Sequence, residues 1–173
     1  VLLYLGLISI FLIAIPTLVM PAKYTLAFGR LSAKYIILIL KIVLNTKVVF
    51  HGLENLKKVD HFFVASAHQS MFETFALQIP LDSPVFILKK ELLSIPLFGT
   101  YLKKLGMIAI DRSQGIQSLR FVNEQASNYS KFRPVIIFPE GTRTAFREEP
   151  DLKPGIYSMY KSLNKLKIYY KLH

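Results

Sequence analysis

Short apolar runs rich in β-branched and aromatic residues recur from residue 46 onward, and they constrain the fold more than any other feature of this chain. The runs are KVVF (47–50), FFVASA (62–67), PVFILK (84–89), MIAI (107–110) and PVIIF (134–138). Between them, residues 70–79 and 114–131 have helical character, and the two prolines of residues 80–84 predict a loop. Strands that alternate with helices are typical of α/β proteins. We therefore predict an α/β domain with a mixed, partly parallel sheet flanked by helices.

The first 45 residues predict a separate helical segment, so the expected domains are 1–45 and 46–173. No charged residue precedes Lys23. A helix of about twenty apolar residues reaches roughly 30 Å, the hydrocarbon thickness of a bilayer, so this run could span a membrane. A cleaved signal peptide and a buried core helix are the alternatives, and the lack of basic residues ahead of the run disfavours the first.

A basic stripe follows the apolar run. Lys23, Arg30, Lys34 and Lys41 are 7, 4 and 7 residues apart, which places them on one side of a helix. Cations on an otherwise apolar helix are typical of a helix in the membrane interface; the alternative is a hydrophobic helix whose lysines extend to water. Basic residues after the first apolar segment also favour the cytoplasmic side for the rest of the chain.

Charge and composition narrow the class of partner. The chain has 22 basic and 11 acidic residues, for a net charge of +11, so we expect an anionic partner such as a phospholipid, a phosphorylated metabolite or an acidic carrier protein. Cysteine is absent, which excludes disulfides, thiolate zinc sites and a cysteine nucleophile. The four histidines lack a zinc-ligand spacing, so no metal is expected. No recognition helix or stacking-aromatic strand motif is evident, so we expect no nucleic acid.

Polar residues follow three of the predicted strands. They are His68 and Glu73 after 62–67, Asp111 and Arg112 after 107–110, and Glu140, Gly141, Thr142 and Arg143 after 134–138. Active residues of α/β proteins gather at the carboxyl ends of strands, so we expect one cleft. Arg112 either reaches a phosphate there or pairs with Asp111.

His68 and Glu73 are candidates for a general base and its carboxylate partner. A histidine acts as a base near neutral pH when a carboxylate fixes its other ring nitrogen. The spacing places the two residues about 140° apart on a regular helix, so contact requires His68 on the turn that precedes a helix carrying Glu73. Two solvated polar residues at a surface turn are the alternative, and this short motif alone does not decide between them.

The segment FPEGTRT contains the parts that hold a phosphate. Gly141 allows a tight turn with exposed N–H groups, Thr142 supplies a hydroxyl and Arg143 supplies a guanidinium. The alternative is an ordinary turn at Gly141, with Arg143 in a surface ion pair with Glu140 or Glu148.

The three blocks, in this order, resemble the motifs of the glycerophospholipid acyltransferases typified by 1-acylglycerol-3-phosphate (lysophosphatidate) acyltransferase. HQSMFE resembles their first motif, a histidine followed by an acid; LFGTYLKKLGMIAIDRS resembles the second block, and FPEGTR the third. The resemblance runs from about Val48 to Gly155, and the apolar N-terminal helices also resemble those of the family. The family's commoner acid in the first motif is Asp, one methylene shorter than Glu73.

The resemblance implies an enzyme of phospholipid biosynthesis. Such an O-acyltransferase moves an acyl group from an acyl thioester to the free hydroxyl of 1-acylglycerol-3-phosphate, which gives phosphatidate without a covalent enzyme intermediate. The donor would be acyl-CoA or acyl carrier protein, and no cofactor is implied. Another lysophospholipid or glycerol-phosphate acceptor is the alternative. The implied location is the membrane, at the cytoplasmic face of a bacterial inner membrane.

The resemblance also implies the site residues. They are the catalytic His68 and Glu73, and the substrate-binding Arg112, Glu140, Gly141, Thr142 and Arg143. His68 would take the hydroxyl proton while Glu73 holds the imidazole. The two arginines would neutralise the acceptor phosphate, and Glu140 would position Arg143 or the glycerol.

The end of the chain departs from this resemblance. LKPG matches the approach to a fourth family motif, but KLKIYYKLH does not resemble that motif. We therefore expect the C-terminal part of the family fold to be missing, which would leave the strand that carries EGTR without a neighbour on one side. An inactive, membrane- or lipid-binding remnant is the alternative to an active enzyme.

Overall fold

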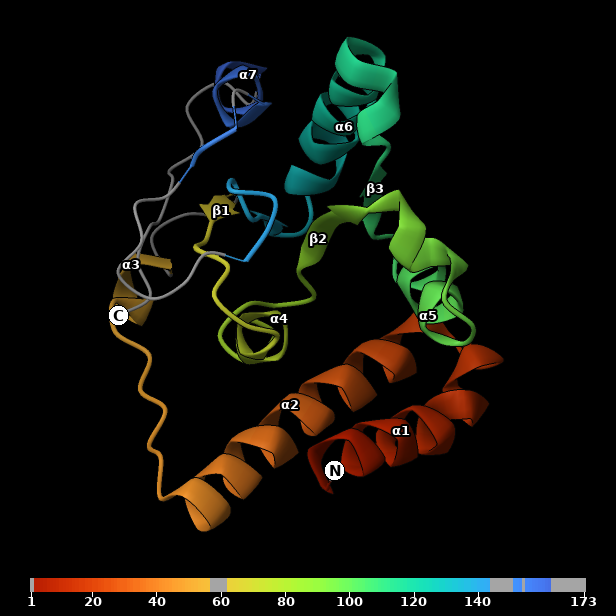
Figure 1. Ribbon diagram of the computed structural model, residues 1–173, viewed down its shortest axis with the longest axis vertical. Helices are drawn as coiled ribbons and strands as arrows, with labels where there is room; N and C mark the ends of the chain where they lie inside the picture. The colour runs from red at the N-terminus through yellow and green to blue at the C-terminus, as the bar shows by residue number, and fades with distance from the viewer. Residues whose placement is uncertain (1, 57–61, 144–150, 154, 163–173) are drawn as a thin grey trace.

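A four-stranded parallel sheet lies at the centre of the described chain (Figure 1). The computed structural model describes residues 2–56, 62–143, 151–153 and 155–162. The strands are β1 (Phe63–Ala65), β2 (Val85–Lys89), β3 (Ile108–Ile110) and β4 (Val135–Ile137), and their order in the sheet is β1-β4-β2-β3. Each lies within a predicted apolar run. The predicted α/β fold, with its parallel strands, is therefore confirmed.

The strand predicted for KVVF (47–50) does not form. This run begins two residues after the left-handed Asn45, which ends helix α2, and it has no regular secondary structure and no sheet partner among the described residues. Val49 is 51% exposed. A β-rich composition favours a strand only where another backbone and a packed face are available, and this run has neither.

Helices cover both faces of the sheet (Figure 1). The α-helices are α1 (Leu2–Ala14), α2 (Ala22–Leu44), α3 (Leu53–Leu56), α4 (Phe72–Ala76), α5 (Phe98–Lys104), α6 (Gly115–Ser130) and α7 (Gly155–Ser162); short 3-10 helices are η1 (Ile15–Leu18), η2 (Lys90–Ser94) and η3 (Arg112–Gln114). Helices α6 and α7 lie on one face, and α4 lies on the other with α2 packed beyond it. The helices predicted within 70–79 and 114–131, and the loop at 80–84, are confirmed.

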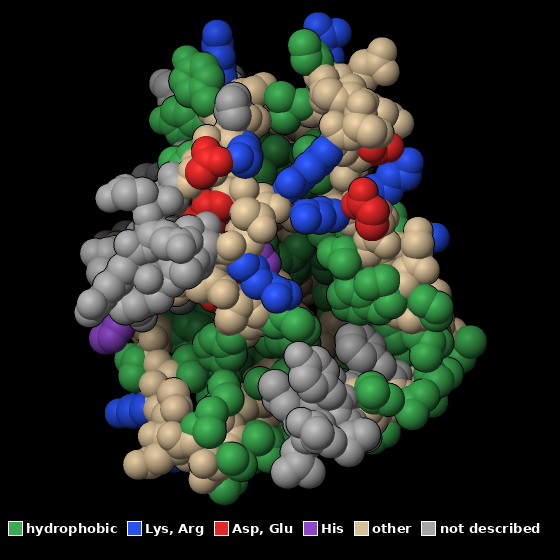
Figure 2. Space-filling view, in the orientation of Figure 1, with side chains coloured by type: hydrophobic (Ala, Val, Ile, Leu, Met, Phe, Trp, Pro, Cys, Tyr) green, Lys and Arg blue, Asp and Glu red, His purple; other side chains and the backbone are tan. Residues whose placement is uncertain are grey.

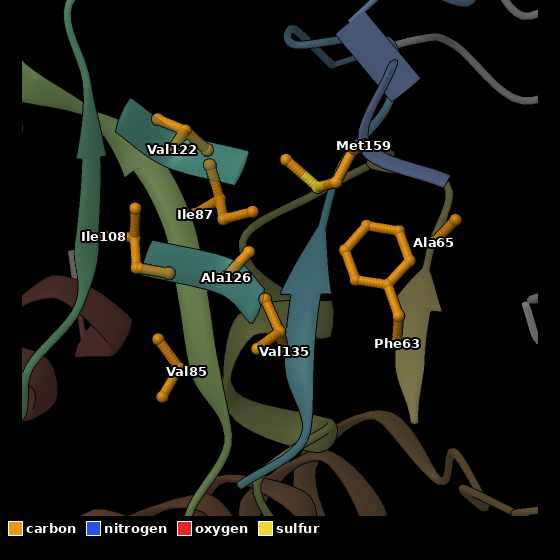
Figure 3. Close-up of a cluster of buried hydrophobic side chains, with 9 residues drawn as sticks. All are labelled: Phe63, Ala65, Val85, Ile87, Ile108, Val122, Ala126, Val135 and Met159. Atoms are coloured by element: carbon orange, nitrogen blue, oxygen red, sulfur yellow. The ribbon is translucent and has the colours of Figure 1, made fainter. Parts of the chain in front are cut away.

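Two apolar clusters pack against the sheet. The first joins strand residues to α6 and α7 (Figure 3): Phe63, Ala65, Val85, Ile87, Ile108, Val122, Ala126, Val135 and Met159. The second comprises Phe62, Val64, Leu81, Phe86 and Ile136. Alternate residues of a strand point to opposite faces, so β1 and β4 contribute to both clusters. Packing in both clusters fixes the positions of the strands, and with them the polar segments that follow the strands.

The N-terminal apolar run is divided between two elements rather than forming one helix. Helix α1 ends at Ala14, and Pro16 lies in the first turn of η1. Proline cannot supply the N–H that continues an α-helix, which explains the break. No helix in the described part of the chain is long and apolar enough to cross a bilayer. The ammonium of Lys104 on α5 donates to carbonyl oxygens of Thr17 and Leu18, both at 2.7 Å, and ties this turn to the α/β domain.

Strand β4 has neighbours on both sides. Val135 is paired with Phe63 of β1 and with Val85 of β2. The expectation that this strand lacks a neighbour is therefore wrong, because β1 supplies the partner that was assigned to a later segment.

Ile136→Ala tests the central position of β4. Ile136 is 0% exposed, so we expect its truncation to lower the free energy of unfolding by about 2–5 kcal/mol. Ile116→Ala is the matched control: Ile116 is 71% exposed near the start of α6, and we expect a change within about 0.5 kcal/mol. Denaturant unfolding of both variants in detergent measures the difference. Equal effects would contradict the described core.

Candidate active site

The carboxyl ends of the strands bring the predicted site residues together. The main-chain N–H of Ser66 donates to the carbonyl oxygen of Ile137 at 3.0 Å, which continues the β1–β4 pairing one residue beyond the end of β1. Further along, the main-chain N–H of His68 donates to Oε2 of Glu140 at 3.1 Å. Two of the predicted polar segments, distant in sequence, therefore meet at one edge of the sheet, as expected.

His68 and Glu73 lie side by side. Nδ1 of His68 is 3.7 Å from Oε2 of Glu73, and the two side chains are 19% and 7% exposed. This separation is longer than a hydrogen bond, and Nδ1 is buried without a hydrogen-bond partner among the described residues. Catalytic contacts are often long in the absence of substrate and shorten in the complex. The geometry directs Nδ1 toward the carboxylate and leaves Nε2 as the nitrogen able to take a proton.

The Glu73 carboxylate also holds the turn before α4. It accepts from the main-chain N–H of Ser70 at 3.1 and 3.0 Å and from that of Gln69 at 3.3 Å. The Ser70 hydroxyl in turn accepts from the N–H of Phe72 at 3.0 Å. Ser70 and Glu73, three residues apart, thereby satisfy free N–H groups around the start of the helix, much as in a capping box, although Met71 directly precedes α4. The Ser-x-x-Glu spacing of residues 70–73 is a pattern typical of a helix start, and it was not among the predictions made from the sequence.

The surroundings of Glu73 keep its carboxyl ionised. Burial raises the pKa of this carboxyl, but the nearby imidazole of His68 and the N–H groups of Glu73 itself and Ser70 lower it by more. The pKa therefore lies below the ordinary value of 4.5. A negative charge beside Nδ1 at neutral pH is the condition for stabilising a protonated imidazole.

Phe138 is a site residue that the sequence analysis missed. Its ring stacks on the imidazole of His68 with centroids 4.3 Å apart and an interplanar angle of 27°. Phe86 lies on the sheet beneath, 6.3 Å from the Phe138 ring. Glu140 is only 3% exposed, and its described bond is to the His68 main chain. Its predicted role toward substrate stays a prediction.

Arg112 contacts the EGTR turn. Its Nη2 donates to the carbonyl oxygen of Gly141 at 2.8 Å. Gly141 has a φ of 65°, a conformation that other residues rarely adopt, and a Cβ there would lie 2.2 Å from Nη2 of Arg112 and would displace that guanidinium. Thr142 and Arg143 continue from this turn and are exposed. Lys and Arg side chains border a hollow at the middle of the face in Figure 2, with part of a histidine visible inside it.

Asp111 does not form the expected alternative pair with Arg112. Its carboxylate instead accepts from Lys90 Nζ at 2.9 Å, and from the N–H and hydroxyl of Ser113 at 3.1 and 2.6 Å. These bonds begin η3, and they leave Arg112 directed to the Gly141 carbonyl. The bonds from Ser113, followed by that from Lys90, lower the pKa of Asp111 to about 2.

The geometry defines the class of protein: an α/β protein with a histidine–carboxylate pair and an arginine-lined turn at one edge of a parallel sheet. The model of the Acyltransferase family matches residues 47–169, and the chain belongs to this family.

Known relatives agree with this assignment. The chain is 38% identical over 111 residues to 1-acyl-sn-glycerol-3-phosphate acyltransferase of Pseudomonas aeruginosa, which covers 64% of this chain and 43% of that protein. It is 38% identical over 97 residues to the protein of the same name from Helicobacter pylori, covering 51% and 40%. It is 31% identical over 97 residues to the human lysophospholipid acyltransferase LPCAT4, covering 54% and 18%. The chain thus matches less than half the length of each.

A solved structure supports the fold. The 1-acyl-sn-glycerophosphate (LPA) acyltransferase PlsC from Thermotoga maritima is similar with a TM-score of 0.62 and 22% sequence identity. The match covers 95% of this chain and 71% of that chain. At this identity the similarity concerns the arrangement of helices and strands.

Asp111→Asn tests the bonds that begin η3. The pKa of Asp111 is about 2 in the fold and 3.8 in an unfolded chain, so its ionised form stabilises the fold above pH 3.8. This stabilisation declines as the pH falls through 2. We therefore expect the variant to melt below the parent at pH 5–7, with a gap that narrows as the pH falls from about 4 to 2. Thermal melts followed by circular dichroism measure the gap.

Asp151→Asn serves as the control, because its side chain is 82% exposed. We expect a smaller change in melting temperature for this variant, since exposed pairs contribute little. A gap for Asp111→Asn that stayed constant down to pH 2 would contradict the assigned bonds.

Proposed function

We propose that this chain transfers a fatty acyl group from an acyl thioester to the free hydroxyl of 1-acylglycerol-3-phosphate, forming phosphatidate. The observation that carries the proposal is that three polar segments meet at one edge of the sheet. His68 lies beside Glu73 in the first segment, and its main chain bonds to Glu140 of the third. Arg112 of the second segment bonds to Gly141 of the third. The two bacterial relatives are 1-acyl-sn-glycerol-3-phosphate acyltransferases, and they suggest the class of reaction and of acceptor.

The chemistry follows from the orientation of His68. With Nδ1 beside the Glu73 carboxylate, Nε2 takes the proton from the acceptor hydroxyl as its oxygen attacks the thioester carbonyl. A C–O bond forms, the C–S bond breaks, and the imidazolium returns its proton to the leaving thiolate. Ionised Glu73 stabilises the imidazolium between these transfers. No covalent enzyme intermediate is required, and the chain contains no cysteine that would form one.

The basic turn supplies the acceptor site. Arg112 lies against the turn that presents Arg143, so two guanidinium groups are available for one phosphate. Holding the phosphate there orients the glycerol hydroxyl toward the base, which is the main contribution that binding makes to such a transfer. Thr142 adds a hydroxyl beside Arg143. The donor is acyl-CoA or acyl carrier protein, and either one presents a thioester.

Three parallel stripes on α2 support binding to a membrane surface. The cations are Lys23, Arg30, Lys34 and Lys41; the exposed apolar residues that directly follow them are Tyr24, Leu31, Tyr35 and Ile42; and buried Thr25, Ser32 and Ile36 come next. Successive helix residues are rotated by about 100°, so an exposed apolar stripe lies between the basic stripe and the buried one. This is the pattern of a helix lying in an interface.

The neighbouring helix extends this apolar surface. On α1, Ile8, Leu12 and Ile13 are 56%, 53% and 67% exposed, and α1 packs beside α2 (Figure 1). Apolar side chains cover the lower part of the face in Figure 2, below the basic hollow. A bilayer surface of the cytoplasmic leaflet would accept these side chains among its acyl chains and hold Lys23, Lys34 and Lys41 at its phosphates, whereas Arg30 pairs with Asp82 at 2.6 Å. The lipid acceptor would then enter from the side of the site.

His68→Ala tests the assignment of the base. We expect turnover to fall by roughly 10²- to 10⁴-fold, because the hydroxyl loses its proton acceptor. His51→Ala is the control, since His51 is exposed in the segment before α3. Labelled acyl donor and lysophosphatidate, assayed in membranes from an acyltransferase-deficient host, measure turnover. Among changes at Glu73, we expect Asp to be milder than Gln, because Asp keeps the charge.

A His68→Ala protein that still transfers acyl groups at the parent rate would contradict this mechanism. A parent chain that binds vesicles but transfers no acyl group would instead favour the remnant alternative.

A triple variant, Leu31→Gln with Tyr35→Gln and Ile42→Gln, tests the membrane surface. Glutamine preserves helix propensity and removes three exposed apolar side chains, so we expect binding to phosphatidylglycerol-containing vesicles to weaken at least tenfold, roughly the effect of 1.4 kcal/mol. Sedimentation with vesicles measures the binding.

The control places three glutamines at Ile116, Phe121 and Phe132, which are 71%, 52% and 82% exposed on and beside α6. We expect vesicle binding of this control to stay near that of the parent. Equal loss in both triple variants would show that general surface hydrophobicity, rather than the α2 stripe, carries the binding.

A further inference from the structure

The segment that follows β4 contacts His68 in two ways that the proposed mechanism does not use. The Phe138 ring stacks on the imidazole at 4.3 Å, and Glu140 Oε2 accepts the main-chain N–H of His68 at 3.1 Å. One contact acts on the ring and the other on the backbone. Together they fix both the position and the tilt of a single side chain.

We propose that Phe138 and Glu140 are positioning residues for His68, and that the first task of Glu140 is to hold the His68 main chain rather than to bind substrate. The inference rests on the proposed role of His68 as the base. It assigns the aromatic and the acidic residue of FPEGTR, Phe138 and Glu140, to the positioning of the base. Binding of the phosphate is left to Arg112 and Arg143.

His68 needs such support because of where it lies. Residues 67 and 68 follow the last bond of the β1–β4 pairing, from Ser66 to Ile137, and have no regular secondary structure of their own. The Glu73 carboxylate, at 3.7 Å from Nδ1, is beyond hydrogen-bond distance. Stacking on Phe138 therefore restrains the ring in the resting site. A base displaced by about 1 Å loses a large part of its rate advantage, so this restraint acts on turnover.

The two supports are themselves well anchored. Phe138 packs on the second apolar cluster, above Phe86, and its carbonyl oxygen accepts the N–H of Gly141 at 3.0 Å. Glu140 is 3% exposed, which removes its carboxylate from bulk water. A buried carboxylate requires donors, and a bond from an N–H group to a charged acceptor is stronger than a neutral one. A substrate-binding group would need to be more accessible than this.

Phe138→Leu tests the stacking. Leucine keeps apolar volume against the cluster but removes the ring, so we expect kcat to fall about tenfold or more while both KM values stay within about twofold. Phe138→Tyr retains the ring and should restore most of kcat. Phe62→Leu is the matched control, because it removes a buried aromatic ring from the same cluster and leaves the stacked rings of Phe86, Phe138 and His68 in place. We expect its kcat to stay within about threefold of the parent.

Glu140→Gln and Glu140→Ala test the main-chain bond. The glutamine oxygen still accepts from the His68 N–H, so we expect a loss in kcat below about tenfold for Gln and about a hundredfold for Ala, with the acceptor KM little changed. If Glu140 binds the glycerol through its charge, Gln and Ala will instead raise the acceptor KM alike. That result would overturn the assignment.

A spectroscopic readout separates this inference from the proposed function. In ¹³C-histidine-labelled chain, an aromatic ring stacked on His68 displaces its imidazole proton signals upfield, and His68→Ala assigns those signals among the four histidines. We expect Phe138→Leu to move them downfield and Phe62→Leu to leave them nearly unchanged. Unmoved signals together with unchanged kcat would overturn the positioning role. If the signals move but the parent transfers no acyl group, the contact stands and the proposed function fails.

Discussion

The pairing of β1 with β4 is the interaction on which the site depends. It runs in register from Phe63 with Val135 to Ala65 with Ile137, and the bond from Ser66 to Ile137 carries it one residue further. Because the strands are parallel, the segments that follow β1 and β4 leave the sheet at the same edge. The N–H of His68 thereby reaches the carboxylate of Glu140, 72 positions later in the sequence. Burial of the apolar strand faces offsets the entropy of closing that loop.

A buried carboxylate is the second constraint. Glu73 is 6% exposed, and a charge at that depth is tolerated only where donors surround it. The N–H groups of Gln69 and Ser70 provide those donors, and they belong to the turn that carries His68 into α4. One side chain therefore caps a helix, satisfies its own charge and faces the imidazole. The alternative of two solvated polar residues at a surface turn does not describe side chains that are only 19% and 7% exposed.

The sequence predicted the elements whose cause is local. Continuous apolar runs between helical segments identified β1 to β4, and polar residues after them predicted one cleft. The run at 47–50 has the same composition but pairs with no strand in the described part of the chain, so it forms no strand itself, which composition cannot reveal. The break at Pro16 was open to prediction from proline chemistry, yet a count of apolar residues alone suggested one long helix.

The contacts around His68 were harder to predict because they join segments distant in sequence. In the sequence, Phe138 is the last apolar residue of a predicted strand. Its ring reaches the imidazole because β4 lies next to β1 in the sheet. The sequence predicted Glu140 as part of a phosphate-binding turn, whereas its buried carboxylate contacts the main chain of His68. The order β1-β4-β2-β3 determines both contacts, and a strand list in chain order does not contain that information.

The most direct measurement is a structure of this chain with lysophosphatidate bound. We expect the acceptor's free hydroxyl within about 2.6–3.2 Å of Nε2 of His68, the hydrogen-bond range for proton abstraction, with its phosphate on the guanidinium groups of Arg112 and Arg143. The Glu140 carboxylate should still hold the His68 main chain. A phosphate bound away from both arginines, or a hydroxyl out of reach of His68, would contradict the proposed site.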